Sequence, residues 1–188
     1  PSYKNTKEII IKKSKSLMRN INSDLSRRLE DVSSTAIFSS LDSRKTNHIS
    51  SDSVHLTVTS PPFLNIVRYA EDNWLRSWFN EIDASKIESK ISSCRTVDKW
   101  SKIMSGVFSE LYRVTVPGGW VAFEVGEVNN GKIKLDEHVI PLGISSGFIC
   151  AGVMVNSQDF TKTSNIWGVE NMKIGTNTNR IVLFHKSK

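Results

Sequence analysis

The sequence predicts an α/β fold with a mostly parallel sheet and helices on both of its faces. Short β-branched and aromatic runs at 54–58, 120–125 and 180–185 have the length and composition of buried strands. The segment 100–114 instead carries apolar residues at steps of three and four, which is typical of an amphipathic helix. Because strand and helix patterns alternate along the chain, we expect helices that connect the strands of one sheet.

The first part of the chain is predicted to be helical and then irregular. Apolar residues within 8–29 recur at helical steps, which indicates one amphipathic helix or two short ones. We expect a short strand at 35–39 and a loop at 40–44. The run 54–58 is predicted to be a buried strand, because it is β-branched and stops abruptly at two prolines.

The rest of the chain continues the alternation. Large apolar residues at helical steps, including Trp74 and Trp78, predict a helix within 65–91 whose tryptophans belong to the core, followed by a mobile polar loop at 85–96. A turn at 117–119 is expected to separate the helix at 100–114 from the next strand. The remaining expected elements are a helix at 137–146, a strand at 148–155, a polar connection at 160–179 and the last strand at 180–185.

Length and charge suit one domain preceded by a basic helical segment at 1–34. The formal charge is +6, and its concentration in that segment favours a phosphate-rich partner such as DNA. No apolar run approaches the roughly 20 residues of a membrane span, and no apolar core of a signal peptide follows the basic N-terminus, so we expect a cytoplasmic protein. Cys94 and Cys150 lack partners at metal-ligand spacing, so neither a metal site nor a disulfide is expected.

The most informative stretch is Thr59, Ser60, Pro61, Pro62 and Phe63, directly after a predicted strand. Two consecutive prolines lock φ and remove two backbone donors, so the loop is stiff and leaves carbonyls free at the sheet edge where α/β proteins bind ligands. There the Ser60 hydroxyl and a carbonyl such as that of Pro61 can accept both protons of a planar amine, while Phe63 stacks on its ring. Those acceptors free the nitrogen lone pair for attack on a sulfonium methyl group. A proline pair alone would also suit an ordinary stiff turn.

This stretch resembles the catalytic motif of cytosine-N4 DNA methyltransferases, in which Ser-Pro-Pro precedes an aromatic residue, whereas adenine-N6 enzymes more often begin with Asp or Asn. Similar segments lie at 41–44, 110–114, 117–126 and 177–184. The resemblance implies a Rossmann-like sheet with an antiparallel last strand, 35–188 being the catalytic half of the domain. It also implies S-adenosyl-L-methionine as cofactor and a base flipped out of DNA as substrate.

The resemblance also implies roles for single residues, none of which needs a metal. Ser60, Pro61, Pro62 and Phe63 are the expected catalytic residues of the base pocket. Asp42 is expected to bind the adenine amine of the cofactor, and Thr59 is the second cofactor-binding candidate. Candidates for contacts with the base or the DNA strand follow closely in the chain: Arg68, Tyr69, Asp72 and Asn73.

One motif of the family is missing from this sequence. The family carries a Phe-x-Gly-x-Gly loop that wraps the methionine part of the cofactor, but the ten glycines here are scattered. The predicted strands also amount to about half of the usual sheet, and an exposed edge in the centre of a sheet is a liability that proteins cover. We therefore expect a split enzyme, in which a second polypeptide or a separated segment supplies the cofactor loop.

Two alternatives stay open. The acceptor could be another amine, either adenine N6 in DNA or a guanine amine in RNA, although the serine of the motif disfavours both. The chain could instead be a non-catalytic DNA-binding subunit that keeps the fold. A restriction-modification enzyme and an orphan methyltransferase fit the sequence equally well.

Overall fold

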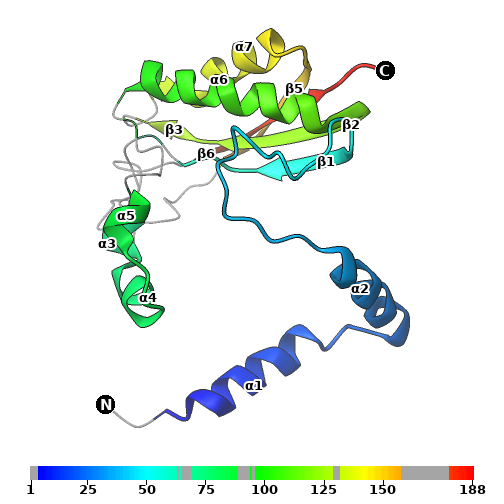
Figure 1. Cartoon of the computed structure of the whole chain (residues 1–188), viewed down its shortest axis with the longest axis vertical. Coiled ribbons are helices and arrows are strands. Elements are labelled where there is room, and N and C mark those ends of the chain that lie inside the picture. The colour runs from blue at the N-terminus through cyan, green and yellow to red at the C-terminus, as the bar shows by residue number, and fades with distance from the viewer. Residues whose placement is uncertain are drawn as a thin grey trace. The chain divides into compact units, whose positions relative to one another are not determined.

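The computed structural model describes residues 4–62, 64, 69–88, 94, 96–128, 132–157 and 178–188 (Figure 1). The chain divides into two compact units, Pro1–Ser40 and Leu41–Lys188. The division falls after Ser40, whereas the sequence analysis placed a boundary after Ser34.

The first unit contains two helices, α1 (Thr6–Leu17) and α2 (Ser23–Thr35). Each begins at an asparagine cap, Asn5 or Asn22, whose side chain accepts a hydrogen bond from the backbone N–H three residues later. Neither helix has a buried residue. Two short helices were one of the two arrangements expected here.

The strand expected at 35–39 is wrong. α2 continues to Thr35, and residues 36–40 have no regular structure. The hydroxyls of Ser33, Ser34 and Thr35 each donate to the carbonyl three residues earlier, at 2.8, 2.7 and 3.1 Å. Such local bonds suit the last turn of a helix. The apolar residues that follow have no strand to pair with among the described residues, and pairing is what stabilises a strand.

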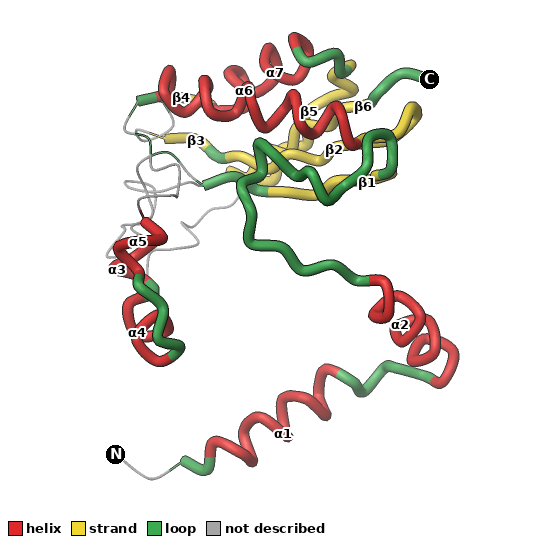
Figure 2. The backbone as a smooth tube through the Cα atoms, viewed as in Figure 1, coloured by secondary structure: helices red, strands yellow, loops and turns green. Residues whose placement is uncertain are grey.

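The second unit is built on a four-stranded mixed sheet with the strand order β1-β2-β6-β5 (Figure 2). β1 (Val54–Thr59) runs parallel to β2 (Thr115–Val125), whereas β6 (Thr178–His185) is antiparallel to both β2 and β5 (Ile149–Ser157). The fold is α/β and its last strand is antiparallel, as expected. Among the described strands of this sheet, parallel pairing is limited to β1 and β2, because β6 runs in the opposite direction between β2 and β5. A separate antiparallel pair is formed by β3 (Glu127–Val128) and β4 (Ile133–Lys134).

Two helices, α6 (Val97–Val114) and α7 (Leu135–Ser145), cover one face of this sheet (Figure 1). The core lies between them and the strands. The ring of Phe108 on α6 lies 4.8 Å from the ring of Phe123 on β2 and 5.2 Å from that of Phe184 on β6, and all three side chains are buried. The apolar face of α6 that the sequence pattern predicted is therefore the face that meets the sheet.

The opposite face of the sheet is apolar but exposed. Its large side chains are 42–74% exposed, and they come from three strands: Leu56, Val58, Trp120, Ile149 and Met154. Along β1 and β2 these residues alternate with buried or half-buried ones, as the two-residue period of a strand requires. Helices were expected on both faces, but among the described residues they cover only one.

The single helix expected within 65–91 is wrong. The described part of this region forms three short helices: α3 (Tyr69–Asp72), α4 (Trp74–Phe79) and α5 (Ala84–Glu88). Asn73 separates the first two, and Glu81 has a left-handed φ of 55° between the second and third. Because the helix is interrupted at these two places, the apolar side chains of the three helices do not form one continuous stripe. The two tryptophans of α4 are 63% and 72% exposed and do not belong to the core, contrary to expectation.

Pro117, Gly118 and Gly119 lie inside β2 and do not form the expected turn. The register between β1 and β2 shifts across them, so they form an irregularity in the strand. Gly118 has a φ of 84°, and a Cβ on Gly119 would lie 2.7 Å from the side chain of Thr115. Hydrogen bonds in both directions with the backbone of Lys186, of 2.8 and 3.0 Å, keep the two glycines within the sheet.

Replacing Phe108 with Ala should lower the free energy of unfolding by about 3–5 kcal/mol, because it leaves a cavity between α6 and two strands. Urea denaturation measures the change. The matched control is Phe79→Ala on α4, where the side chain is 78% exposed and the expected change is within about 0.5 kcal/mol. Equal losses for the two variants would contradict the assignment of Phe108 to the core.

Candidate active site

The loop that carries the motif leaves the sheet at the carboxyl end of β1. Thr59 is the last residue of the strand and pairs with Phe123 of the parallel strand β2. Beyond it Ser60 is exposed, whereas Pro61 and Pro62 are half-buried. Phe63 lies outside the described residues. The loop therefore occupies the sheet edge that the sequence analysis predicted for it.

A pocket of about 380 Å³ lies beside this loop. It is lined by residues of the segment 43–49 before β1, of β1 and the loop after it, of α6 and of β2. The contributing residues are Ser43, Thr46, Ile49, Val54, Thr57, Thr59, Ser60, Pro61, Pro62, Met104, Val107, Glu110, Leu111, Val114 and Phe123. Its volume is within the range typical of pockets for small molecules, and its walls are mostly apolar with a few hydroxyls.

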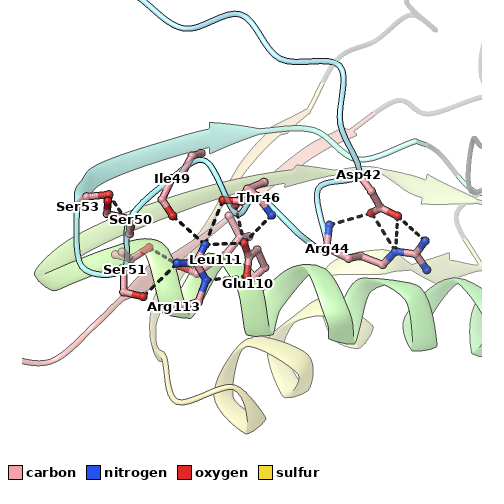
Figure 3. Close-up of polar contacts among 11 residues, drawn as sticks. Asp42, Arg44, Thr46, Ile49, Ser50, Ser51, Ser53, Glu110, Leu111 and Arg113 are labelled. Carbon is pink, nitrogen blue, oxygen red and sulfur yellow. Dashed lines mark hydrogen bonds and ion pairs between the residues drawn. The ribbon is translucent and has the colours of Figure 1, made fainter.

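The segment before β1 is fastened to α6 by hydrogen bonds to a partly buried ion pair of that helix, Glu110 and Arg113 (Figure 3). The Glu110 carboxylate accepts hydrogen bonds from the backbone N–H and the hydroxyl of Thr46, at 2.7 and 2.6 Å. Arg113 donates to Glu110 and also to the carbonyls of Thr46 and Ile49 and the hydroxyl of Ser51. The hydrogen bonds from Arg113 and Thr46 lower the pKa of Glu110 from 4.5 to about 2. This network fixes one wall of the pocket.

Asp42, a predicted cofactor-binding residue, lies in the same segment and is ion-paired with Arg44 (Figure 3). Its carboxylate accepts from the backbone N–H of Arg44 and from the guanidinium, with a shortest distance of 2.6 Å. These bonds lower the pKa of Asp42 from 3.8 to about 2. About half of each side chain is exposed. Asp42 is therefore a fixed anion at the surface, adjacent in sequence to Ser43 of the pocket wall.

The predicted substrate-binding residues are only partly described. Arg68 lies outside the described residues, and Tyr69 is described only as the first residue of α3. The Asp72 Oδ2 atom is buried and has no hydrogen-bond partner among the described residues. Asn73 precedes α4 and its side-chain oxygen accepts a 2.8 Å hydrogen bond from Arg76. Asp72 and Asn73 are not among the described residues that line the pocket beside the loop.

Several residues of the site were not singled out by the sequence analysis. Trp100 donates a hydrogen bond to the Pro62 carbonyl, and Glu110 and Arg113 hold the wall around Thr46. The capping pattern at Thr96 and the helical period do indicate α6 itself. No local pattern links these residues to partners 38–67 positions away.

Within the described part of the chain, no group of three or more His, Cys, Asp or Glu side chains is placed to hold a metal ion. In the same residues, no helix has the length and apolar character needed to cross a membrane. Cys94 and Cys150 are both free thiols.

Comparison with known proteins shows one relative by sequence. The chain is 33% identical over 107 residues to the Type II methyltransferase M.MjaI of Methanocaldococcus jannaschii, a match that covers 50% of this chain. The chain spans about a third of that relative, 34% of its length. No family model matches the chain.

Solved structures give weaker similarity. TTHA0409 of Thermus thermophilus, provisionally named a DNA modification methylase, is 20% identical with a TM-score of 0.46, covering 78% of this chain and 51% of that one. Its complex with S-adenosyl-L-methionine gives 19% identity and the same TM-score and coverage. A SAM-dependent methyltransferase from Methanosarcina mazei is 10% identical with a TM-score of 0.44, covering 89% of this chain and 80% of that one.

The Glu110→Gln variant should lose roughly 2 kcal/mol of unfolding free energy at pH 7, because Arg113 and Thr46 lose a charged acceptor. The pKa of Glu110 is lowered in the folded state, so its stabilisation is complete above pH 4.5 and disappears as the pH falls toward 2. The wild type and the variant should therefore converge in stability over that window. Denaturation curves between pH 2 and pH 7 measure the effect.

Glu137→Gln is the matched control, because that carboxylate is 67% exposed and 3.9 Å from Lys134. It should change stability by less than about 0.5 kcal/mol at any pH. If Glu110→Gln were as stable as the control variant at pH 7, the ion pair would not hold the pocket wall.

Proposed function

We propose that this chain is the catalytic part of an S-adenosyl-L-methionine-dependent DNA methyltransferase that acts on the N4 amine of cytosine. The observation that carries the proposal is the placement of Ser60, Pro61 and Pro62 at the carboxyl end of the parallel strand β1, beside the pocket. The loop sequence and the similarity to the Type II methyltransferase M.MjaI support it.

The residues at the pocket fit one end of the cofactor. Aliphatic side chains such as Val54 suit the adenine ring, and the hydroxyls of Ser43 and Thr59 suit its polar groups. Three N–H groups of Arg44 bond to the Asp42 carboxylate, which can accept about four hydrogen bonds, so it can also accept one from the adenine amine. Among the described residues no Lys or Arg lines the pocket, so the carboxylate of the methionine part needs partners from elsewhere.

The loop residues account for the chemistry of the transfer. When bound, S-adenosyl-L-methionine supplies an electrophilic methyl group. The Ser60 hydroxyl oxygen and the Pro61 carbonyl accept hydrogen bonds from the two N–H groups of the target amine, which turns the nitrogen lone pair toward the methyl group. As the nitrogen–methyl bond forms, the bond between methyl and sulfur would break, and one proton of the amine leaves to solvent. Acceptors held in place before the reaction stabilise the positive charge that develops on the amine, and such preorganisation raises kcat. Phe63 stacks on the base.

Serine at position 60 favours cytosine over adenine. By resemblance, adenine-N6 enzymes more often carry Asp or Asn at this place. The target amine takes part in a Watson–Crick pair, so the base must leave the duplex before it reaches Ser60. The positive charge of the chain, concentrated in its first 34 residues, suits the DNA backbone. The substrate candidates Arg68, Tyr69, Asp72 and Asn73 follow the loop and keep their proposed role in DNA contacts.

A second polypeptide or segment that completes the domain is part of the proposal. β1 is at the edge of the sheet among the described strands, so one side of its backbone lacks a strand partner. The exposed apolar face around Leu56, Val58 and Trp120 continues from this edge. The match to M.MjaI covers only 34% of that enzyme, so most of its length lies outside the match. The missing Phe-x-Gly-x-Gly loop would come from the completing part.

Ser60→Ala should lower kcat for methyl transfer by about 10²–10³-fold in the assembled enzyme, because one proton acceptor of the amine is lost. Transfer of labelled methyl groups to DNA measures the rate, and nucleoside analysis of the product identifies the base. Methylated cytosine is expected. Methylated adenine, or modification of RNA instead, would favour the alternative acceptors.

The control is Ser145→Ala on α7, whose exposed hydroxyl bonds to the carbonyl of Leu142. This variant should keep the wild-type rate. If activity persisted in both serine variants, the chain would be a non-catalytic subunit and the catalytic proposal would fail.

The chain by itself should bind S-adenosyl-L-methionine at least about 100-fold more weakly than the assembled enzyme, because the partners of the methionine part are missing. Isothermal titration of both samples measures the two dissociation constants. Tight binding by the isolated chain would argue against a split cofactor site.

A further inference from the structure

The carbonyl of Pro62 is held by a buried tryptophan. Trp100 lies in the first turn of α6, and its indole Nε1–H donates a 3.1 Å hydrogen bond to the Pro62 oxygen. The Trp100 side chain is 0% exposed. Leu64, two residues after Pro62, is 5% exposed and belongs to the same buried cluster. The loop is therefore anchored to α6 at Pro62.

The two prolines make such an anchor necessary. Neither has a backbone N–H, so the loop backbone cannot donate a hydrogen bond at these two positions. Thr59 is fixed by pairing with β2, and the Pro62 carbonyl is fixed by Trp100. Because both proline φ angles are locked, the adjustable torsions between the two fixed points are those of Ser60 and the ψ angles of Pro61 and Pro62.

This anchor decides which carbonyl stays available. The Pro62 oxygen is turned to the buried Trp100 of α6 and already accepts its hydrogen bond, so we assign the substrate acceptor to the Pro61 carbonyl. The Ser60 hydroxyl and the Pro61 carbonyl have no hydrogen-bond partner within the described residues. These are the two acceptors that an exocyclic amine needs.

We propose that Trp100 is the positioning residue of the methyl-transfer site. By holding the Pro62 carbonyl, it sets the Pro61 carbonyl and the Ser60 hydroxyl in the orientation that receives the amine. Trp100 itself touches neither substrate nor cofactor. This role rests on the proposed function, and misplacing acceptors by a fraction of an ångström should act on the rate rather than on binding.

The first measurement tests the anchor independently of activity. Hydrogen exchange of the indole N–H groups is followed by NMR in the full chain labelled with ¹⁵N at tryptophan, and the Trp100 signal is assigned by its loss in Trp100→Phe. It should exchange at least about 100-fold more slowly than the signals of Trp74 and Trp78, which are 63% and 72% exposed. An exchange rate equal to theirs would overturn the proposal.

The second measurement removes only the donor. β-(Benzothienyl)alanine at position 100 keeps the shape of the ring but has sulfur in place of the N–H. In the assembled enzyme, kcat should fall by about 10–100-fold while KM for S-adenosyl-L-methionine stays near the wild-type value. The urea midpoint should fall only by the small amount that one lost hydrogen bond explains. Trp74→Phe is the control for loss of an exposed indole and should leave all three unchanged.

The outcomes separate this role from the proposed function. An unchanged kcat in the position-100 variant overturns the role of Trp100 only. A lower kcat that is fully explained by a smaller folded fraction of the variant under assay conditions would show that Trp100 is merely structural. That result overturns the role of Trp100 as well. Absence of methyl transfer by the wild-type assembled enzyme overturns the proposed function and this role with it.

Discussion

The packing of α6 on the buried face of the sheet is the interaction on which the rest of the second unit depends. Phe108 contacts one ring on β2 and one on β6, so this contact joins the middle strands of the sheet to the helix. The same helix supplies Trp100 at its start and Glu110 and Arg113 near its end. A displacement of α6 would therefore move the core, the loop and the pocket wall together.

β1 is held at both ends by groups from distant parts of the sequence. At its start, the buried Lys186 ammonium donates to the Asp52 carboxylate at 2.7 Å and to the carbonyls of Tyr112 and Thr115 at 2.8 and 2.9 Å. At its end, the loop is held by the indole of Trp100. An edge strand with one parallel neighbour has few ladder hydrogen bonds, so these side-chain contacts contribute strongly to its placement.

The two faces of the sheet are the basis of the proposal that a further segment completes the domain. On the helix side, the side chains of Val121, Phe123, Val182 and Phe184 are almost fully buried. On the other side, the alternate residues of the same strands expose large apolar side chains, and proteins ordinarily cover such a surface. Among the described strands β1 lies at the edge of the sheet, and this edge adjoins the apolar surface. A completing segment that covered both would also lie next to the pocket and the Ser-Pro-Pro loop.

Local patterns in the sequence determined the strand at β1, the stiff proline loop after it and the helix α6, because backbone restriction and apolar period act within a few residues. They did not determine the breaks at Asn73 and Glu81, the irregularity at Gly118, or the burial of each tryptophan. Tertiary structure alone decided that Trp100 meets Pro62 and that Glu110 meets Thr46, 38 and 64 residues away. It also decided that β6 lies between β2 and β5. The reason is that such contacts are selected by the packing of whole elements, and no short stretch of sequence contains both partners.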